Sequence, residues 1–361
     1  MNSSPSFQAA AWRRLRKNKG AIFGLVVIVI AVLVAIFAYF IAPDPSPFAN
    51  RIILEIGGEK PGFKQSFIKV KKEKDVAETS FIKQLISGKE DVYYYVPIVS
   101  HEKKGDSIIV QKFIDEGLSE RQAYAKTQLS AEPIVTKNFI LGTDKFGRDI
   151  LSRLIIGTRV SLSVGLITVI ISLSIGLILG SLAGYFRGRT DNIIMWFINV
   201  IWSIPTLLLV FAITLVLGKG FWQVFIAVGL TMWVNVARLV RGQVLGVREL
   251  EYVEATRVLG FSSFRTIVRH IWPNIMGPVI VIAASNFASA IVIEAGLSFL
   301  GVGVQPPQPS WGLMIKENYN FIITQNPMLA LAPGFAIMLL VLAFNLLGNG
   351  LRDALNVRGK F

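Results

Sequence analysis

The stretch Val160–Phe186 reads VSLSVGLITVIISLSIGLILGSLAGYF and contains no charged residue. A helix rises about 1.5 Å per residue and the hydrocarbon core of a bilayer is about 30 Å thick, so about 20 such residues cross it. Small residues recur at every fourth position, namely Ser172, Gly176, Gly180 and Gly184. One face of the helix is therefore almost bare, which favours close packing against another helix. The stretch predicts a membrane-spanning helix inside a bundle.

Five further runs have the same apolar character: Ala21–Ala42, Asn192–Gly218, Gly220–Ala237, Ile271–Ile293 and Met328–Leu347. The composition agrees with this pattern, because 53% of the residues are hydrophobic and only 17% are charged. Pro205 should kink the third span, and further breaks are expected at Pro278 and Pro333. Ordinary packing irregularities are the alternative to functional kinks. The sequence predicts an all-α polytopic membrane protein with six transmembrane helices.

The orientation follows from the basic residues in the short connections, which favour the cytoplasmic side. They are Arg13, Arg14, Arg16, Lys17, Lys19, Arg187, Arg189, the six arginines from Arg238 to Arg269, Arg352, Arg358 and Lys360. The opposite short connections hold only Lys219 and Lys316. Both termini are thus predicted to be cytoplasmic. Most of the formal net charge of +14 is this orientation signal and not a footprint of nucleic acid.

The first apolar run follows basic residues, as in a signal peptide. Its length exceeds the usual apolar core of a signal peptide, and no cleavage site of small residues is evident, so we expect a retained anchor.

The segment between the first two spans, residues 43–150, mixes charges of both signs and is predicted to lie outside. Two of its stretches alternate as strands do, DVYYYVPIV and DSIIVQKFI. SERQAYAKT, residues 119–127, is predicted to be a helix with Ser119 as N-cap and Gln122 completing a capping box. The segment predicts a small α+β domain, which serves either as a solvated spacer or as a docking platform for an extracytoplasmic partner.

Catalytic and metal-binding patterns are missing from the sequence. There is no cysteine, and His101 and His270 are the only histidines. The loop from Gly142 to Asp149 has the glycine spacing of a phosphate-binding loop, but Arg148 and Asp149 replace the lysine and the hydroxyl residue. We therefore expect no catalytic residue, no metal site and no cofactor in this chain. Any uphill transport must draw on an ion gradient or on a partner ATPase.

Within the spans, Glu294 is the acidic residue that a coupling ion would need. It is interpreted either as a hydrogen-bonded structural carboxylate or as a residue that lines or gates a pathway. A single acid gives little support to proton coupling, so the energy source is expected in a partner.

The connection after the fourth span, residues 248–276, reads RELEYVEATRVLGFSSFRTIVRHIWPNIM. It predicts a short helix that ends near Gly260, followed by a second helix capped by Ser262 or Ser263. Phe261 and Phe264 would offer apolar contacts beside the turn. Such an exposed helix-turn-helix fits a soluble partner; a surface-lying amphipathic segment is the alternative, and DNA binding at a membrane face is disfavoured.

At these residues the sequence resembles the permease subunits of bacterial ATP-binding-cassette importers, whose cytoplasmic loop follows EAA–x3–G–x10–I–x–P. Here the loop reads Glu254-Ala255-Thr256, Gly260 and Ile271-Trp272-Pro273, where Thr256 and Trp272 replace the usual Ala and Leu. Four longer stretches resemble the C-type subunit of the oligopeptide, dipeptide and nickel branch: GTDKFGRDILSRLIIGTRVSLSVGL, RGRTDNIIMWFINVIWSIPTLLLV, EAGLSFLGVGVQPPQPSWGLMI and PGFAIMLLVLAFNLLGNGLRDALNVR.

The resemblance implies a type I importer permease fold in a bacterial plasma membrane. Its parts would be a basic N-terminus (1–20), a first helix (21–42), the insert (43–150), a core (158–350) with helices at about 160–186, 192–218, 220–240, 277–300 and 328–349, a coupling loop (241–275) and a cytoplasmic tail (351–361). The implied partners are a second permease in a heterodimer, two ATPases, an external peptide-binding protein and membrane lipid, with no nucleic acid.

The resemblance also assigns site residues. Those expected to couple to the ATPase are Glu251, Glu254, Ala255, Thr256, Leu259, Gly260, Phe261 and Pro273. Those expected along the pathway or at an external gate are Glu294, Gln305 and Trp311, while Gly176, Gly180, Gly184 and Pro205 pack or kink the helices. The implied function is a translocation pathway for oligopeptides or dipeptides. The alternatives are nickel or another small solute, an ion-coupled carrier, or a membrane-tethered enzyme or nucleic-acid protein.

Overall fold

The computed structural model describes residues 7–73, 79–323 and 326–355 of the 361-residue chain. They belong to two compact units. The helical unit comprises residues 1–31, 161–305 and 337–361, and the insert unit comprises residues 32–160 and 306–336. The far ends of the predicted N-terminus and tail, with Arg358 and Lys360, lie outside the described residues.

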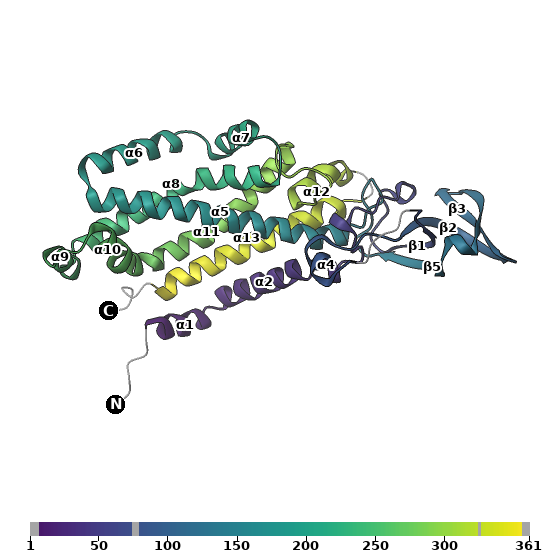
Figure 1. Ribbon diagram of the computed structural model, residues 1–361, viewed down its shortest axis with the longest axis horizontal. Coiled ribbons are helices and arrows are strands. Elements are labelled where there is room, and N and C mark those ends of the chain that lie inside the picture. Colours follow the sequence, from purple (N-terminus) through teal and green to yellow (C-terminus); the bar gives the residue numbers. More distant parts are fainter. Residues whose placement is uncertain (1–6, 74–78, 324–325, 356–361) are drawn as a thin grey trace, which may run out of the picture. The chain divides into compact units, whose positions relative to one another are not determined.

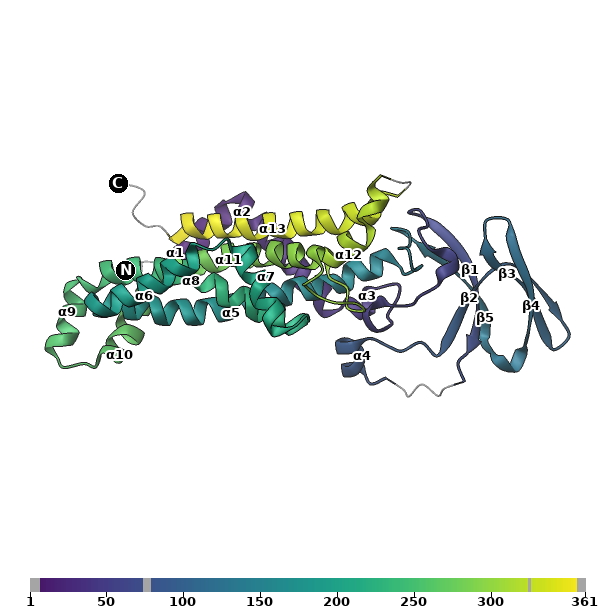
Figure 2. The same cartoon turned by 90° about the horizontal axis from the view of Figure 1, so that it is seen from above.

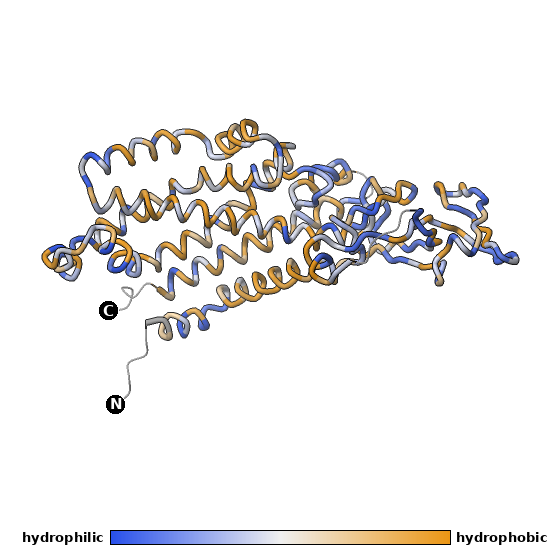
Figure 3. The backbone as a smooth tube through the Cα atoms, viewed as in Figure 1, coloured by the Kyte–Doolittle hydropathy of each residue, from blue (hydrophilic) through white to orange (hydrophobic). Residues whose placement is uncertain are grey.

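The helical unit is built from long apolar helices (Figures 1 and 3). Its elements are α1 (Phe7–Lys17), α6 (Gly188–Trp202), α7 (Thr206–Leu217), α8 (Phe221–Arg248), α9 (Glu251–Val258), α10 (Ser263–Thr266) and α11 (Trp272–Leu300). It also contains the larger part of α2 (Lys19–Ile36), α5 (Ile150–Phe186) and α13 (Met328–Leu355), each of which has one end in the insert unit. Among the described residues, five helices are long and apolar enough to cross a membrane, and six if α6 and α7 count as one broken span. The predicted polytopic helical protein is thus confirmed.

The prolines have different effects on the helices. At Pro205 the chain bends by 91° between α6 and α7, as the missing N–H and the ring of proline favour. The breaks predicted at Pro278 and Pro333 are wrong, because both residues lie inside continuous helices. One proline removes a single backbone hydrogen bond. The hydrogen bonds of the neighbouring turns keep α11 and α13 helical.

Helix α8 is the most buried candidate span, with 67% of its apolar window buried against 11% in α2. It continues to Arg248, beyond the end expected near residue 240, and Arg241 in this extension pairs with Asp191 of α6 at 2.5 Å. Helix α5 likewise begins at Ile150 and α11 at Trp272, both earlier than expected.

The ends of several helices lie together within the helical unit. Figures 1 and 2 place α1, α9, α10 and the C-terminal end of α13 at the same end of the bundle. Leu15 and Ala21 pack against Leu351 and Ala354 there. The two ends of the described chain and the loop between α8 and α11 therefore share one side.

The insert unit contains an antiparallel sheet of five strands in the order β4-β3-β2-β1-β5. The strands are β1 (Phe63–Lys71), β2 (Tyr93–Lys104), β3 (Ser107–Asp115), β4 (Leu118–Ala125) and β5 (Leu129–Phe139). In β1 the neighbours Phe67 and Ile68 are both fully buried and belong to different core clusters. Because successive side chains of a strand point to opposite faces, both faces of the sheet bury apolar residues. The unit also contains three short α-helices, α3 (Ala38–Ile41), α4 (Phe81–Ser87) and α12 (Trp311–Asn318).

The helix predicted at Ser119–Thr127 is wrong, because Leu118–Ala125 forms strand β4. The chain turns after Asp115 through Glu116 and Gly117, whose φ of 79° suits a tight hairpin. The hairpin pairs β4 with β3 along its whole length, and Gln122 and Tyr124 share one face, where their side chains are hydrogen-bonded at 2.7 Å. Ladder pairing with an adjacent strand outweighs the local capping signal.

Candidate functional site

The loop between α8 and α11 begins with α9, which ends in a glycine-dependent cap. Gly260 has a φ of 74°, in the left-handed region that favours glycine. Its N–H donates to Arg257 O at 3.0 Å, and the N–H of Phe261 donates to Thr256 O at 2.9 Å. These two bonds are the Schellman pattern that closes a helix. Ser262 then caps α10 by accepting the N–H of Arg265 at 3.4 Å.

The inner face of this loop packs on the helical bundle. Val253 is fully buried in an apolar cluster with Tyr185 of α5, residues of α8 and the start of α11. Thr256 is only 4% exposed, and its hydroxyl donates to Val253 O at 2.7 Å and pairs with the Thr266 hydroxyl at 3.2 Å. Thr256 therefore joins α9 to α10 and does not form part of the loop's outer surface.

The outer face of the loop carries both charge and apolar area. Its exposed side chains include Glu251, Tyr252, Glu254, Ala255, Arg257, Val258, Leu259, Phe264 and Arg265. Leu259 and Phe264 are 71% and 77% exposed, which is unusual for large apolar side chains. Phe261 lies half-buried beneath the guanidinium of Arg265, 4.3 Å away, so it supports the surface. Pro273 is exposed in the first turn of α11.

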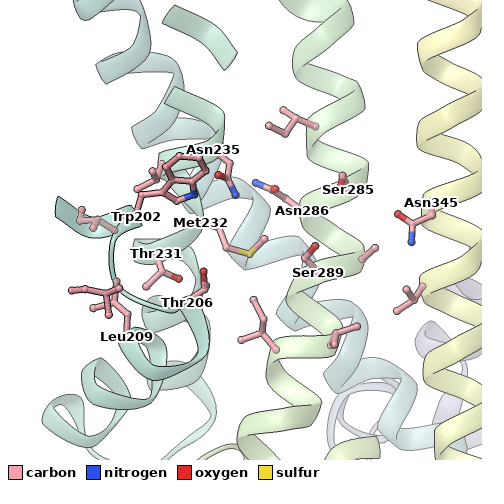
Figure 4. A pocket seen from close by; sticks show the side chains of 18 residues that line it. Trp202, Thr206, Leu209, Thr231, Met232, Asn235, Ser285, Asn286, Ser289 and Asn345 are labelled. Carbon is pink, nitrogen blue, oxygen red and sulfur yellow. The ribbon is translucent and has the colours of Figure 1, made fainter. Parts of the chain in front are cut away.

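A second feature is an open cavity of about 600 Å³ among the helices of the helical unit (Figure 4). It is lined by Ile201, Trp202, Ile204, Thr206, Leu209, Thr231, Met232, Val234, Asn235, Ile282, Ser285, Asn286, Ala288, Ser289, Val292, Ile293, Val341 and Asn345. The break between α6 and α7 forms one wall, while α8, α11 and α13 form the others. The cavity therefore lies among helices that are long enough to cross a membrane.

Neutral polar side chains distinguish the cavity. Asn235, Asn286 and Asn345 project into the space between α8, α11 and α13, with serine and threonine hydroxyls nearby (Figure 4). None of the lining residues that the structure describes carries a charge. Asn286 Nδ2 is buried and has no hydrogen-bond partner within the described chain. Each side-chain amide offers both a donor and an acceptor, so the surface matches a solute rich in amide groups.

Glu294 lies outside this cavity, although the sequence suggested it as a pathway residue. It is fully buried on α11 and accepts the Ser298 hydroxyl at 2.6 Å. Ser298 in turn accepts the N–H of Val304 at 3.0 Å, which holds the turn after α11. Gln305 donates within that turn to Gly303 O at 2.8 Å. These bonds join Glu294 to the turn that follows α11.

Trp311 is buried within the insert unit. Its indole N–H donates to Leu154 O at 3.0 Å, and its ring packs so closely on Gly157 that a Cβ there would lie 2.9 Å away. The residue fastens α12 to the first part of α5. The ion pair between Glu317 and Arg153 holds α12 to the same part of α5.

A buried ion network lies beside Trp311, and sequence reasoning did not find it. Arg148 bonds Asp144 at 2.6 Å and Glu317 at 2.8 Å, and the fully buried Arg153 lies 3.4 Å from Glu317. Asp144 and Arg148 belong to the loop that resembled a phosphate-binding loop, so its side chains are committed to internal pairs. The four-residue spacing of Asp144 and Arg148 is a local signal for an ion pair. The other partner of Arg148, Glu317, is 169 positions away and gives no local signal.

The small residues of α5 meet α8. A Cβ at Gly176 would lie 2.4 Å from Val236 Cβ, and one at Gly180 would lie 2.5 Å from Ala237 O. A Cβ at Gly184 would lie 2.8 Å from Val244 Cβ. Helix α5 thus packs backbone to backbone on α8. Helix α8 lines part of the cavity and leads into the loop that contains α9 and α10.

Two family models match parts of this chain. Residues 176–359 match the family model described as binding-protein-dependent transport system inner membrane component, and residues 6–53 match the N-terminal transmembrane domain of oligopeptide transport permease C. An oligopeptide transport system permease protein of Bacillus subtilis is 39% identical over 250 residues, 69% of this chain and 82% of that protein. A glutathione transport system permease protein of Pectobacterium atrosepticum is 42% identical over 220 residues, 61% of this chain and 73% of that protein.

Among solved structures, an inward-facing conformation of the MetNI methionine ABC transporter aligns with a TM-score of 0.48 at 17% identity. The alignment covers 56% of this chain and 96% of that chain.

Proposed function

Because this chain belongs to the family of inner membrane components of binding-protein-dependent transport systems, it is a multi-pass subunit of an ATP-binding-cassette transporter, and we propose that it forms part of the pathway for imported peptides. ATP is hydrolysed in separate subunits of such transporters, and the permease carries no cofactor. The observation that supports a peptide is the uncharged cavity lined by asparagine, serine and threonine.

The chemistry of the cavity suits peptides of many sequences. A peptide backbone carries one donor and one acceptor at most residues, and the side chains of Asn235, Asn286 and Asn345 can satisfy both kinds of group. A cavity without charge neither attracts nor repels a particular side-chain charge. Asn235 and Asn345 are exposed in this chain, and polar groups in the middle of a span are not expected to face lipid. A second permease would cover this side and complete the pathway.

The loop residues 249–271 form the proposed contact for the ATPase. Its exposed face carries the side chains of Glu251, Glu254, Ala255 and Leu259. The cap at Gly260 sets the turn beside them. A movement of this face would reach α8 and α11 because Val253 and Ile267 are buried in one cluster with both helices. The same two helices carry most of the cavity lining. ATP-driven closure of the ATPases would thus shift the bundle between two states with different access to the cavity.

The proposed assembly contains a second permease, two cytoplasmic ATPases and an extracytoplasmic peptide-binding protein. The proposed orientation places both termini and the α9–α10 loop in the cytoplasm, since basic residues concentrate there. The location of α1 and the end of α13 at the same end of the bundle as this loop supports that arrangement. We propose that Glu294, Gln305 and Trp311 stabilise the connections on the extracytoplasmic side.

Uptake of a labelled peptide by a strain that lacks this chain tests the function directly. We expect uptake to return with the chain, to fall with competing peptides of graded length, and to continue under an uncoupler while ATP remains high. Competition by nickel and not by peptides would favour a metal substrate. Loss of uptake under the uncoupler at constant ATP would favour an ion-coupled carrier.

A further inference from the structure

Helix α4 of the insert unit exposes an apolar surface that its own unit leaves uncovered. Phe81, Ile82 and Ile86 are 65%, 66% and 61% exposed. Large apolar side chains gathered on one short helix, next to polar residues, mark a surface that another phase or molecule covers. Neighbouring Lys83 and Lys89 are exposed as well.

Contacts tie α4 to the end of the first span. The ring of Phe81 lies 5.2 Å from the ring of Phe40 in α3, which follows α2 directly. At the other end of α4, Gly88 lies so close to Tyr39 that a Cβ would be 2.8 Å from the Tyr39 ring. Both ends of α4 are therefore held against residues 39–40.

A second set of contacts ties α4 to the start of the apolar part of α5. The guanidinium of Arg159 donates to the carbonyl oxygens of Leu85 and Ile86 at 3.0 and 3.2 Å. The same guanidinium lies 5.1 Å from the centre of the Tyr39 ring. Arg159 thus connects the C-terminal end of α4 to both spans.

These contacts define the level of α4 relative to the bilayer. The first apolar run ends at Ala42, and the second begins at Val160, directly after Arg159. Tyrosine and arginine at the ends of spans are typical of the membrane–water interface. Helix α4 contacts Tyr39 and Arg159, which lie at the ends of these two apolar runs.

We propose that α4 is an interfacial anchor, with Phe81, Ile82 and Ile86 inserted into the outer leaflet and Lys83 and Lys89 near lipid phosphates. Interfacial helices bury their apolar face about 5–10 Å into the headgroup and acyl boundary. Helix α4 lies between β1 and β2 in the chain, so the anchor ties this part of the insert to the membrane surface. The insert is then more than a flexible spacer.

The absence of cysteine from the chain allows a sharp test. Ile82→Cys in the full chain is labelled with the environment-sensitive fluorophore NBD and reconstituted into vesicles of phosphatidylethanolamine and phosphatidylglycerol. We expect blue-shifted emission and at least threefold stronger quenching by spin-labelled lipids than at Leu118→Cys, an exposed apolar position on β4. Iodide in the water should quench the Leu118 label more strongly.

Equal quenching of the two labels by lipid and by iodide would overturn the proposal. Protection of the Ile82 label from iodide without quenching by lipid would also overturn it, since a protein surface would then cover α4. A second label, Ile86→Cys, guards against a local disturbance at Ile82 and should respond in the same way.

Discussion

Thr256 Oγ1 lies 3.2 Å from Thr266 Oγ1, and this buried hydroxyl pair joins the two short helices of the proposed coupling loop. Thr256 occupies the position at which the resembled motif has alanine. A hydroxyl here adds an internal bond between α9 and α10, so the departure from the motif alters the stiffness of the loop and leaves its outer surface unchanged.

Thr256→Val is expected to loosen this loop. The substitution keeps the shape of the side chain but leaves Thr266 without its hydroxyl partner, at a cost of about 1–3 kcal/mol. Hydrogen exchange of the α9 amides in the full chain should accelerate about fivefold or more, while Thr256→Ser should remain close to the parent. Unchanged exchange in the valine variant would contradict the role of the pair.

Leu259→Asp is expected to abolish co-purification of the ATPases. Leu259 is 71% exposed, so a charge there costs the fold little but removes apolar area from the proposed contact. Leu118→Asp is the matched control, because Leu118 is 57% exposed on the sheet of the insert and should leave co-purification intact. If the Leu259 variant retains its ATPases at parent levels, the exposed face is not the contact.

Gly180→Ala is expected to destabilise the helical unit. The new methyl group would lie 2.5 Å from the backbone oxygen of Ala237, so α5 and α8 would have to separate. Such overpacking costs about 1–3 kcal/mol. Gly242→Ala provides the control, since no atom lies within 4 Å of its would-be Cβ and alanine favours the helix by up to about 1 kcal/mol. Thermal unfolding in detergent should show a lower Tm for the first variant alone.

Asn345→Asp is expected to make the proposed pathway selective for charge. A carboxylate in an otherwise uncharged cavity repels acidic peptides, so their uptake relative to that of basic peptides should fall severalfold. Asn192→Asp, on an exposed part of α6 outside the cavity, should leave the ratio unchanged. An unaltered ratio in the Asn345 variant would place the peptide elsewhere.

Lys137 is expected to make the stability of the sheet depend on pH. Burial, followed by the positive charge of Arg51, lowers the pKa of Lys137 to about 8, against the attraction of Asp44, Asp91 and Asp149. The unfolded chain then binds more protons than the folded chain between pH 8 and the ordinary lysine pKa, so stability should rise with pH across that window.

Unfolding of the insert in the full chain, followed by a fluorophore on Leu118→Cys, measures this effect. The midpoint temperature should increase between pH 7.5 and about pH 9.5. Lys137→Met should remove most of the increase. The same increase in both proteins would show that another group titrates.

Local patterns predicted the parts of the fold that depend on local chemistry. Charge-free runs indicated the spans, because a helix in lipid makes its backbone hydrogen bonds within its own segment. Such a helix can therefore be predicted from that segment alone. The turn at Gly260 was equally local, since a left-handed cap requires glycine wherever it occurs. The helix prediction for Ser119–Thr127 was wrong because the conformation of this segment depends on pairing with β3. Local residues alone do not encode that pairing.

The sequence by itself determined that this chain is a helical membrane protein with an inserted domain, an α9–turn–α10 loop and a bare face on α5. The tertiary structure alone decided that Thr256 faces inward, that neutral side chains from α7, α8, α11 and α13 meet in one cavity, and that Arg148 finds Glu317. The physical reason is distance along the chain: periodicity and caps act over a few residues, whereas cavities and buried ion pairs join residues that only packing brings together.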